Sequence, residues 1–210
     1  MIQEVVAIID RSGSMSGKEA DTIGGINSTI EELKGNKGNK SNEIIKFSVK
    51  FFDHQEYLKI RSLDIENVRP LNIKDLMPRG QTALLDAMGS TISFFINKKM
   101  CDPSSYDSCI IYVATDGYEN CSKKFTNENI KNLIEQAKKY SIEILYLGAN
   151  QDAILEASKF GLDANQAMNY SENTENIESA YRSAARAAKR YRSGNNAGFL
   201  DAERTASVTQ

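Results

Sequence analysis

The sequence predicts an α/β fold in which a mostly parallel sheet is covered by helices on both faces. Short apolar runs at residues 5–9 and 110–114 are typical of strands that are buried on both faces. Segments with apolar residues at helical spacing alternate with such runs, and this alternation favours a parallel sheet. With 210 residues, 40% of them hydrophobic, the chain is long enough for one domain with a sizeable core.

The first part of the chain predicts a strand, a helix and a hairpin. After the strand at 5–9, Ser16 and Glu19 have the spacing of a capping box, which predicts that the first helix starts at Ser16. The apolar residues of this helix recur on one face: Ile23, Ile26, Ile30 and Leu33. Residues 45–51 alternate apolar and polar side chains, and 57–63 return as a charged strand, so this hairpin is expected at a sheet edge.

The rest of the chain predicts a regular alternation of helices and strands. Helices are expected at about 83–97, 127–140, 152–160 and 174–192, and strands at 110–114, 142–147 and 167–170. We expect one domain over residues 1–193. Residues 194–210 are expected to form a C-terminal tail that is flexible or docks through Phe199 and Leu200.

Oxygen-bearing side chains gather in the loops where ligands bind in such sheets, at the carboxyl ends of the strands. Asp10, Ser12 and Ser14 follow the first strand, Thr82 precedes the second long helix, and Asp116 follows the strand at 110–114. Two carboxylates and three hydroxyls suit a hard divalent ion, Mg²⁺ or Mn²⁺. The spacing Asp-x-Ser-x-Ser places three of these side chains on alternate positions of one tight loop. These residues are therefore predicted to be metal ligands.

Each hydroxyl taken alone has a simpler interpretation. Ser16, Thr82 and Thr126 each precede a predicted helix and could serve only as helix N-caps. Asp10 with Ser12 and Ser14 directly after a buried strand favours the metal site.

Three segments resemble the motifs of von Willebrand factor type A domains. Residues 9–15, Ile-Asp-Arg-Ser-Gly-Ser-Met, match the D-x-S-G-S-M signature, residues 80–84 resemble the threonine loop of that family, and residues 114–117 resemble its aspartate loop. The resemblance implies a doubly wound sheet of about six strands with one antiparallel edge strand. It also implies a metal-ion-dependent adhesion site. Ser12, Ser14 and Thr82 would then contact the metal directly or nearly so, whereas Asp10 and Asp116 would act largely through water.

The function expected from these residues is that of a non-enzymatic, metal-dependent module that binds an acidic residue of a protein partner. The rim of the site would contact that partner through Arg11, Arg79, Gly80, Tyr118 and Glu119. The alternative is a Mg²⁺-dependent hydrolase or phosphotransfer enzyme that uses the same oxygen cluster. Glu119 is the only plausible general base in these loops, and the chain has no phosphate-binding G-x-x-x-x-G-K-[ST] motif.

Charge and cysteine usage limit the other partners. The net charge of −2 does not call for nucleic acid or membrane, although the last predicted helix is basic on one side and leaves nucleic-acid binding as a further alternative. Its basic residues are Arg182, Arg186, Lys189, Arg190 and Arg192. Three cysteines without C-x-x-C spacing indicate reduced thiols and a cytoplasmic protein. In the tail, Asp201 or Glu203 would provide a carboxylate for metal-dependent self-association.

Overall fold

A six-stranded sheet forms the centre of the molecule. The computed structural model describes residues 1–35, 43–149, 152–195 and 198–208. The strands are β1 (Ile2–Asp10), β2 (Ile44–Phe52), β3 (Glu56–Asp64), β4 (Ser108–Thr115), β5 (Ile142–Ala149) and β6 (Ala167–Tyr170). Their order in the sheet is β3-β2-β1-β4-β5-β6. All neighbours are parallel except the edge strand β3, which is antiparallel to β2, so the predicted fold class is confirmed.

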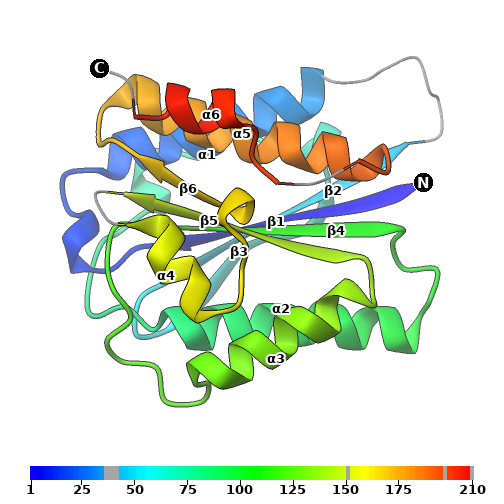
Figure 1. Ribbon diagram of the computed structural model, residues 1–210. Coiled ribbons are helices and arrows are strands. Elements are labelled where there is room, and N and C mark those ends of the chain that lie inside the picture. The colour runs from blue at the N-terminus through cyan, green and yellow to red at the C-terminus, as the bar shows by residue number, and fades with distance from the viewer. Residues whose placement is uncertain (36–42, 150–151, 196–197, 209–210) are drawn as a thin grey trace.

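Helices cover both faces of this sheet (Figure 1). One face carries α1 (Glu19–Gly35), α5 (Thr174–Arg192) and the short α6 (Asp201–Ala206), and the other carries α2 (Leu84–Cys101), α3 (Asn127–Lys138) and α4 (Ala153–Lys159). Each face has its own apolar core, because alternate residues of the central strands point to opposite sides. In the helices that the structure describes, no segment is long and apolar enough to span a membrane.

Close helix packing on the first face depends on a glycine. A methyl group on Gly25 of α1 would lie only 2.8 Å from the ring of Tyr181 on α5, so the absence of a side chain lets the two helices meet. The Tyr181 ring in turn stacks edge-on against Tyr112 of β4 and Tyr170 of β6. These aromatic contacts fix α5 against β6 and against β4, whose end forms part of the site described below.

The first helix begins later than its sequence predicts. Residues Gly13–Met15 form a turn of 3₁₀-helix, and Ser16 ends that turn, so the expectation that Ser16 caps the first helix is wrong. The helix α1 starts at Glu19, directly after Lys18. Ser12 is the N-cap of this turn and Ser14 lies within it, so both precede α1.

The C-terminal segment packs against the domain in its described part. Phe199 is 3% exposed within the core under α5, and its N–H donates to the Asn165 carbonyl over 2.6 Å. Glu203 pairs with Arg190 of α5, and the Ser207 hydroxyl donates to the Asn169 carbonyl of β6. These contacts hold α6 over the outer strand of the sheet.

Candidate metal centre

The loops at the carboxyl ends of β1 and β4 meet the segment before α2 at one end of the molecule. Backbone hydrogen bonds join them: the Gly13 N–H donates to the Gly80 carbonyl over 3.1 Å, and the Arg79 N–H donates to the Arg11 carbonyl over 2.8 Å. The loop after β4 is joined in the same way, because Asn120 and Thr82 exchange two hydrogen bonds of 2.9 and 3.1 Å. These hydrogen bonds hold the three loops together in one arrangement.

Within this arrangement the five predicted metal donors converge. The Ser12 and Ser14 hydroxyls are 3.0 Å apart, and the Ser14 hydroxyl donates to Asp116 Oδ1 over 2.6 Å. A methyl group on Gly117 would lie 3.4 Å from Thr82 Oγ1, 3.6 Å from Ser14 Oγ and 3.9 Å from Asp10 Oδ2. The donors thus lie around one small space beside Gly117.

Thr82 belongs to this cluster and does not cap a helix. The N-cap position of α2 is Ala83, which makes no side-chain cap, and the Thr82 side chain is 3% exposed beside Gly117. Thr126, in contrast, is the N-cap of α3 and accepts a hydrogen bond from the Asn129 N–H. Thr126 therefore caps a helix, whereas Thr82 faces the metal donors.

Asp10 is the most deeply placed donor and is poorly compensated. Its side chain is buried at the end of β1, where Oδ1 accepts from the Ser12 N–H and Oδ2 accepts from the Thr115 hydroxyl, both over 2.6 Å. Desolvation by burial raises the pKa of Asp10 to about 6 against the lowering effect of these hydrogen bonds, and the charge of Asp116 adds to the rise. A divalent cation beside this carboxylate would relieve that penalty, so the site fits a metal ion.

Lys18 supplies the positive charge nearest to the cluster. Its ammonium donates to Asp116 Oδ2 over 2.6 Å and also pairs with Glu172 in the loop between β6 and α5. Burial alone would lower the pKa of Lys18, but the hydrogen bonds and charges of Asp116 and Glu172 raise it above its usual value. Lys18 therefore already neutralises the outer oxygen of one predicted metal donor.

Asp53, directly after β2, forms ion pairs with two of the predicted rim residues, Arg11 and Arg79. It is fully buried, and its Oδ2 lies 2.9 Å from Nε of both Arg11 and Arg79. The only histidine, His54, places Nδ1 3.3 Å from the other Asp53 oxygen. A methyl group on Gly80, which has a φ of +68°, would meet this ring at 2.3 Å, so Gly80 is required by both backbone and packing.

Glu119 holds the loop after β4. Its carboxylate accepts from the N–H groups of Leu85, Cys121 and Ser122 and from the Ser122 hydroxyl, at 2.7–2.9 Å. A carboxylate that already accepts four hydrogen bonds is poorly placed to take a proton from a substrate. The one residue that could have been a general base is thus engaged in holding the loop.

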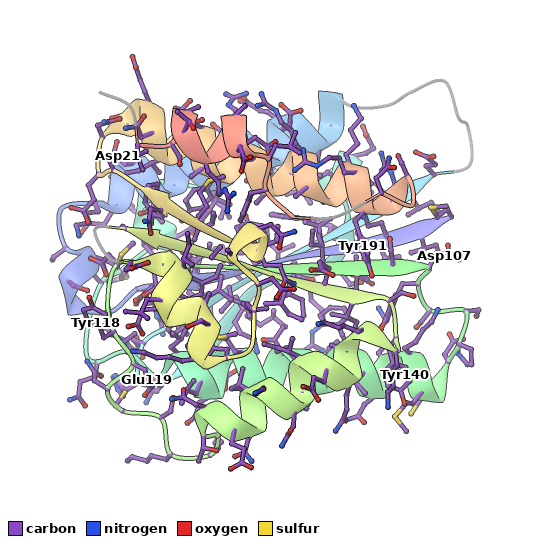
Figure 2. The ribbon with its side chains drawn as sticks, in the orientation of Figure 1. Asp21, Asp107, Tyr118, Glu119, Tyr140 and Tyr191 are labelled. Atoms are coloured by element: carbon purple, nitrogen blue, oxygen red, sulfur yellow. The ribbon has the colours of Figure 1, made fainter. Side chains whose placement is uncertain are left out.

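The predicted rim residues differ in how much of them is accessible. Figure 2 shows Tyr118 and Glu119 at the end of the molecule that carries the metal donors, and Tyr118 is 58% exposed. The Arg79 side chain is 52% exposed, whereas that of Arg11 is 11% exposed and lies against the Tyr57 ring. Among these residues, Arg79 and Tyr118 offer the largest accessible surface. A role of the rim in partner binding stays a prediction.

Sequence reasoning missed three residues that shape the site. Lys18 and Thr115 contact metal donors that lie 98 and 105 positions away in the chain, and Asp53 pairs with Arg11 and Arg79. A signal for Thr115 was present, because it precedes Asp116 at the end of a buried strand, where side chains face the same loops.

No three His, Cys, Asp or Glu side chains gather as a metal site in the described ranges, so a metal at this edge would depend on hydroxyls together with two carboxylates. A doubly wound α/β fold with such an oxygen cluster at the carboxyl edge of its sheet defines a class of metal-dependent adhesion folds. The von Willebrand factor type A domain family matches residues 4–183, and the chain belongs to this family.

Solved structures with the same fold are distant in sequence. The von Willebrand factor domain of the type V pili tip protein Mfa5 from Porphyromonas gingivalis has a TM-score of 0.61 at 13% identity, over 95% of this chain and 98% of that one. Proximal thread matrix protein 1 from the mussel byssus has a TM-score of 0.60 at 12% identity, over 89% of this chain and 46% of the mussel chain. A further structure of the mussel protein, with a zinc-occupied MIDAS motif, has a TM-score of 0.54 at 14% identity and covers 87% and 46% of the two chains. No curated protein sequence matches the chain.

Proposed function

We propose that this domain binds a protein partner through a divalent metal, Mg²⁺ or Mn²⁺, held by Asp10, Ser12, Ser14, Thr82 and Asp116. The observation that supports this most directly is the convergence of hydroxyl and carboxylate oxygens on the space beside Gly117. Neutral hydroxyls supply three of the five donors, so the ion would keep part of its positive charge. An anionic side chain from a partner, an Asp or Glu carboxylate, would complete its ligands.

Two features support a binding module over an enzyme. Glu119 is engaged by four hydrogen bonds, and the sole histidine lies against Gly80 beside Asp53, where its ring packs on the loop.

The basic face of α5 has acidic partners, which argues against nucleic-acid binding. Arg182 faces Glu31 and Glu178, Arg186 faces Glu32, Arg190 pairs with Glu203, and Arg192 faces Glu43. These pairs leave little net positive charge for a nucleic acid.

The direct test is selection from a displayed library of random peptides on immobilised protein, in Mg²⁺ and in EDTA. We expect Mg²⁺ to enrich peptides with a shared Asp or Glu, and we expect binding to disappear when that residue becomes Asn or Gln. Asp10→Ala should select nothing above background. Asp21→Ala is the matched control, because Asp21 is an aspartate at the same end of the molecule outside the cluster (Figure 2). Equal enrichment by wild type and Asp10→Ala would refute the proposal.

The enzymatic alternative predicts a different result. A Mg²⁺-dependent hydrolase would release product from phosphoesters or nucleotides, at a rate that falls in Glu119→Gln while metal binding persists. We expect no turnover above background in wild type.

Self-association is a narrower version of the same proposal. Both tail acids form ion pairs, Glu203 with Arg190 and Asp201 with Arg204. The Glu203 side chain is 8% exposed and that of Asp201 is 92% exposed, so Asp201 is the acid that could reach a second copy. Light scattering of the full chain in Mg²⁺ and in EDTA should show a metal-dependent increase in mass that Asp201→Asn removes. The same mass in all conditions would assign the carboxylate to a different protein. A cytoplasmic setting is a further part of this proposal. The free thiols of Cys101, Cys109 and Cys121 support it.

A further inference from the structure

A second concave site lies between helix α2 and the β2–β3 hairpin. It is a groove of about 280 Å³ that is lined by the polar face of the hairpin and by one side of the helix. This volume approaches the lower end of the range for small-molecule pockets. The metal-site residues do not line it.

The edge strand β3 pairs irregularly with β2 at two points, and the irregularity beside Ser48 shapes the groove. Opposite Val49 stands Ile60, and opposite Phe47 stands Leu63, so Arg61 and Ser62 together face the single residue Ser48. Such a bulge breaks the alternation of side chains, and both Arg61 and Ser62 line the same groove although they are neighbours in a strand. The bulge has directed an arginine into the groove.

The bulge is held in place at a conformational cost. Ser62 has a φ of +44°, which is unusual for a residue with a side chain. Its N–H donates to the Ser48 hydroxyl over 2.8 Å, and its own hydroxyl donates to the buried Glu4 over 2.5 Å. Three side chains thus fix a strained backbone where a regular hairpin would need none.

The groove has one cationic side chain that is not in an ion pair within the described residues. Lys50 pairs with Glu56 at 2.7 Å, and Lys98 pairs with Glu4 at 2.6 Å behind Ser62. Arg61 is exposed and has no ion-pair partner within the described ranges of the chain. The lining therefore has a surplus of one positive charge, on a guanidinium whose geometry matches a carboxylate.

The groove also presents apolar surface to water. Leu58 on β3 is 37% exposed and Phe94 on α2 is 52% exposed, and both line it above the buried Val6 and Phe95. An apolar body placed here would cover an aromatic ring and a leucine that are otherwise half in solvent.

We propose that the groove between α2 and the β2–β3 hairpin binds a small monocarboxylate with an apolar body. The carboxylate pairs with the guanidinium of Arg61, and the apolar body packs on Leu58 and Phe94. Ser90 and Thr91 line the helix side, where their hydroxyls are already engaged: Ser90 donates to Glu56 and Thr91 donates to the Ala87 carbonyl. The site does not depend on the metal-dependent function proposed above.

The test uses 3-phenylpropanoate as the probe and its neutral amide, 3-phenylpropanamide, as the comparison, titrated into the full chain and followed by amide chemical shifts. We expect saturable shifts at residues 58–62 and 90–95, with the amide binding about tenfold or more weakly because it cannot form the charge-assisted pair. Arg61→Gln should weaken the acid by about the same factor and leave the amide unchanged. Phe94→Ser should weaken both probes.

Two control variants separate this groove from the rest of the molecule. Arg69→Gln removes another exposed arginine outside the groove and should leave both affinities unchanged. Asp10→Asn alters the metal site and should also leave the groove unaffected. Equal binding of acid and amide, unchanged binding in Arg61→Gln, or shifts confined to other regions would overturn the proposal.

Discussion

Two acidic side chains at the same end of the molecule have opposite environments. Asp86, in the first turn of α2, accepts hydrogen bonds of 2.9–3.0 Å from the N–H groups of Lys123, Lys124 and Phe125. Burial would raise the pKa of Asp86, but these backbone donors lower it below its usual value. Asp10, in contrast, has two neighbouring donors and a pKa raised to about 6.

The difference separates residues that hold the fold from residues that await a ligand. A buried carboxylate with enough donors stabilises the folded chain, because its charge is compensated. A buried carboxylate without them costs stability, and a fold that keeps it gains something else from the charge. Asp86 and Glu119 fix the loop after β4 around the start of α2, and Asp10 uses the rigid space that they create.

The largest effect expected from this comparison is metal stabilisation. At a Mg²⁺ concentration of one hundred times Kd, an ion bound only by the folded state should stabilise the wild type by about 2.7 kcal/mol. Asp10→Asn should lose this stabilisation, and Asp86→Asn should retain it. The measurement is urea unfolding with Mg²⁺ and with EDTA. A metal effect that is equal in wild type and Asp10→Asn would contradict the assignment of the ligands.

The second effect concerns Asp86 alone, in EDTA. Asp86→Asn should destabilise the metal-free protein by about 2 kcal/mol, a fall in Tm of roughly 4–8 °C, because three backbone donors lose their charged acceptor. The exposed Asp102 is the control, and Asp102→Asn should leave the Tm close to that of wild type. An Asp86→Asn variant as stable as the control would mean that these hydrogen bonds do not hold the loop.

Much of the fold and of the metal site could be predicted from the sequence, but the contacts of Asp86 could not. The sheet with its antiparallel edge strand follows from the alternation of apolar runs and helical segments. Oxygen donors that directly follow a strand must lie at the carboxyl edge of the sheet, so their meeting there could be predicted. The pairing of Asp86 with residues 123–125 depends on how one loop closes over a helix, and no local pattern specifies it. Similarly, the bulge at Ser62 leaves no mark in a sequence that reads as a regular strand.

The third effect has the opposite sign and depends on pH. The folded pKa of Asp10, about 6, lies above its ordinary value of 3.8, so between these values the folded state binds more protons than the unfolded state. Stability of the metal-free protein should therefore fall as pH rises through this window, and the loss should be complete above about pH 6–7. Relative to wild type in EDTA, Asp10→Asn should gain about 2 kcal/mol between pH 4.5 and pH 7.5.

Unfolding curves at the two pH values measure this gain, with Asp86→Asn as the comparison. Because the pKa of Asp86 is lowered, its stabilising contribution is present above about pH 4 and is lost only as pH falls further, so it should be constant over the same window. A constant difference between Asp10→Asn and wild type would show that Asp10 is compensated in the metal-free protein.

The smallest effect tests the cation that stands beside the cluster. Lys18 and a bound metal would both interact with Asp116, so the ammonium competes with the ion or repels it. Lys18→Met should raise Mg²⁺ affinity several-fold, by about 1 kcal/mol of binding energy at most, because Lys18 is partly exposed and screened by water. Titration calorimetry at low and at high salt measures this change, which should shrink as salt rises. Lys34→Met, at the other end of α1 and away from the cluster, is the control. If Lys18→Met weakens Mg²⁺ binding instead, Lys18 orients Asp116 for the metal, and Asp116 resembles Asp86 more closely than Asp10.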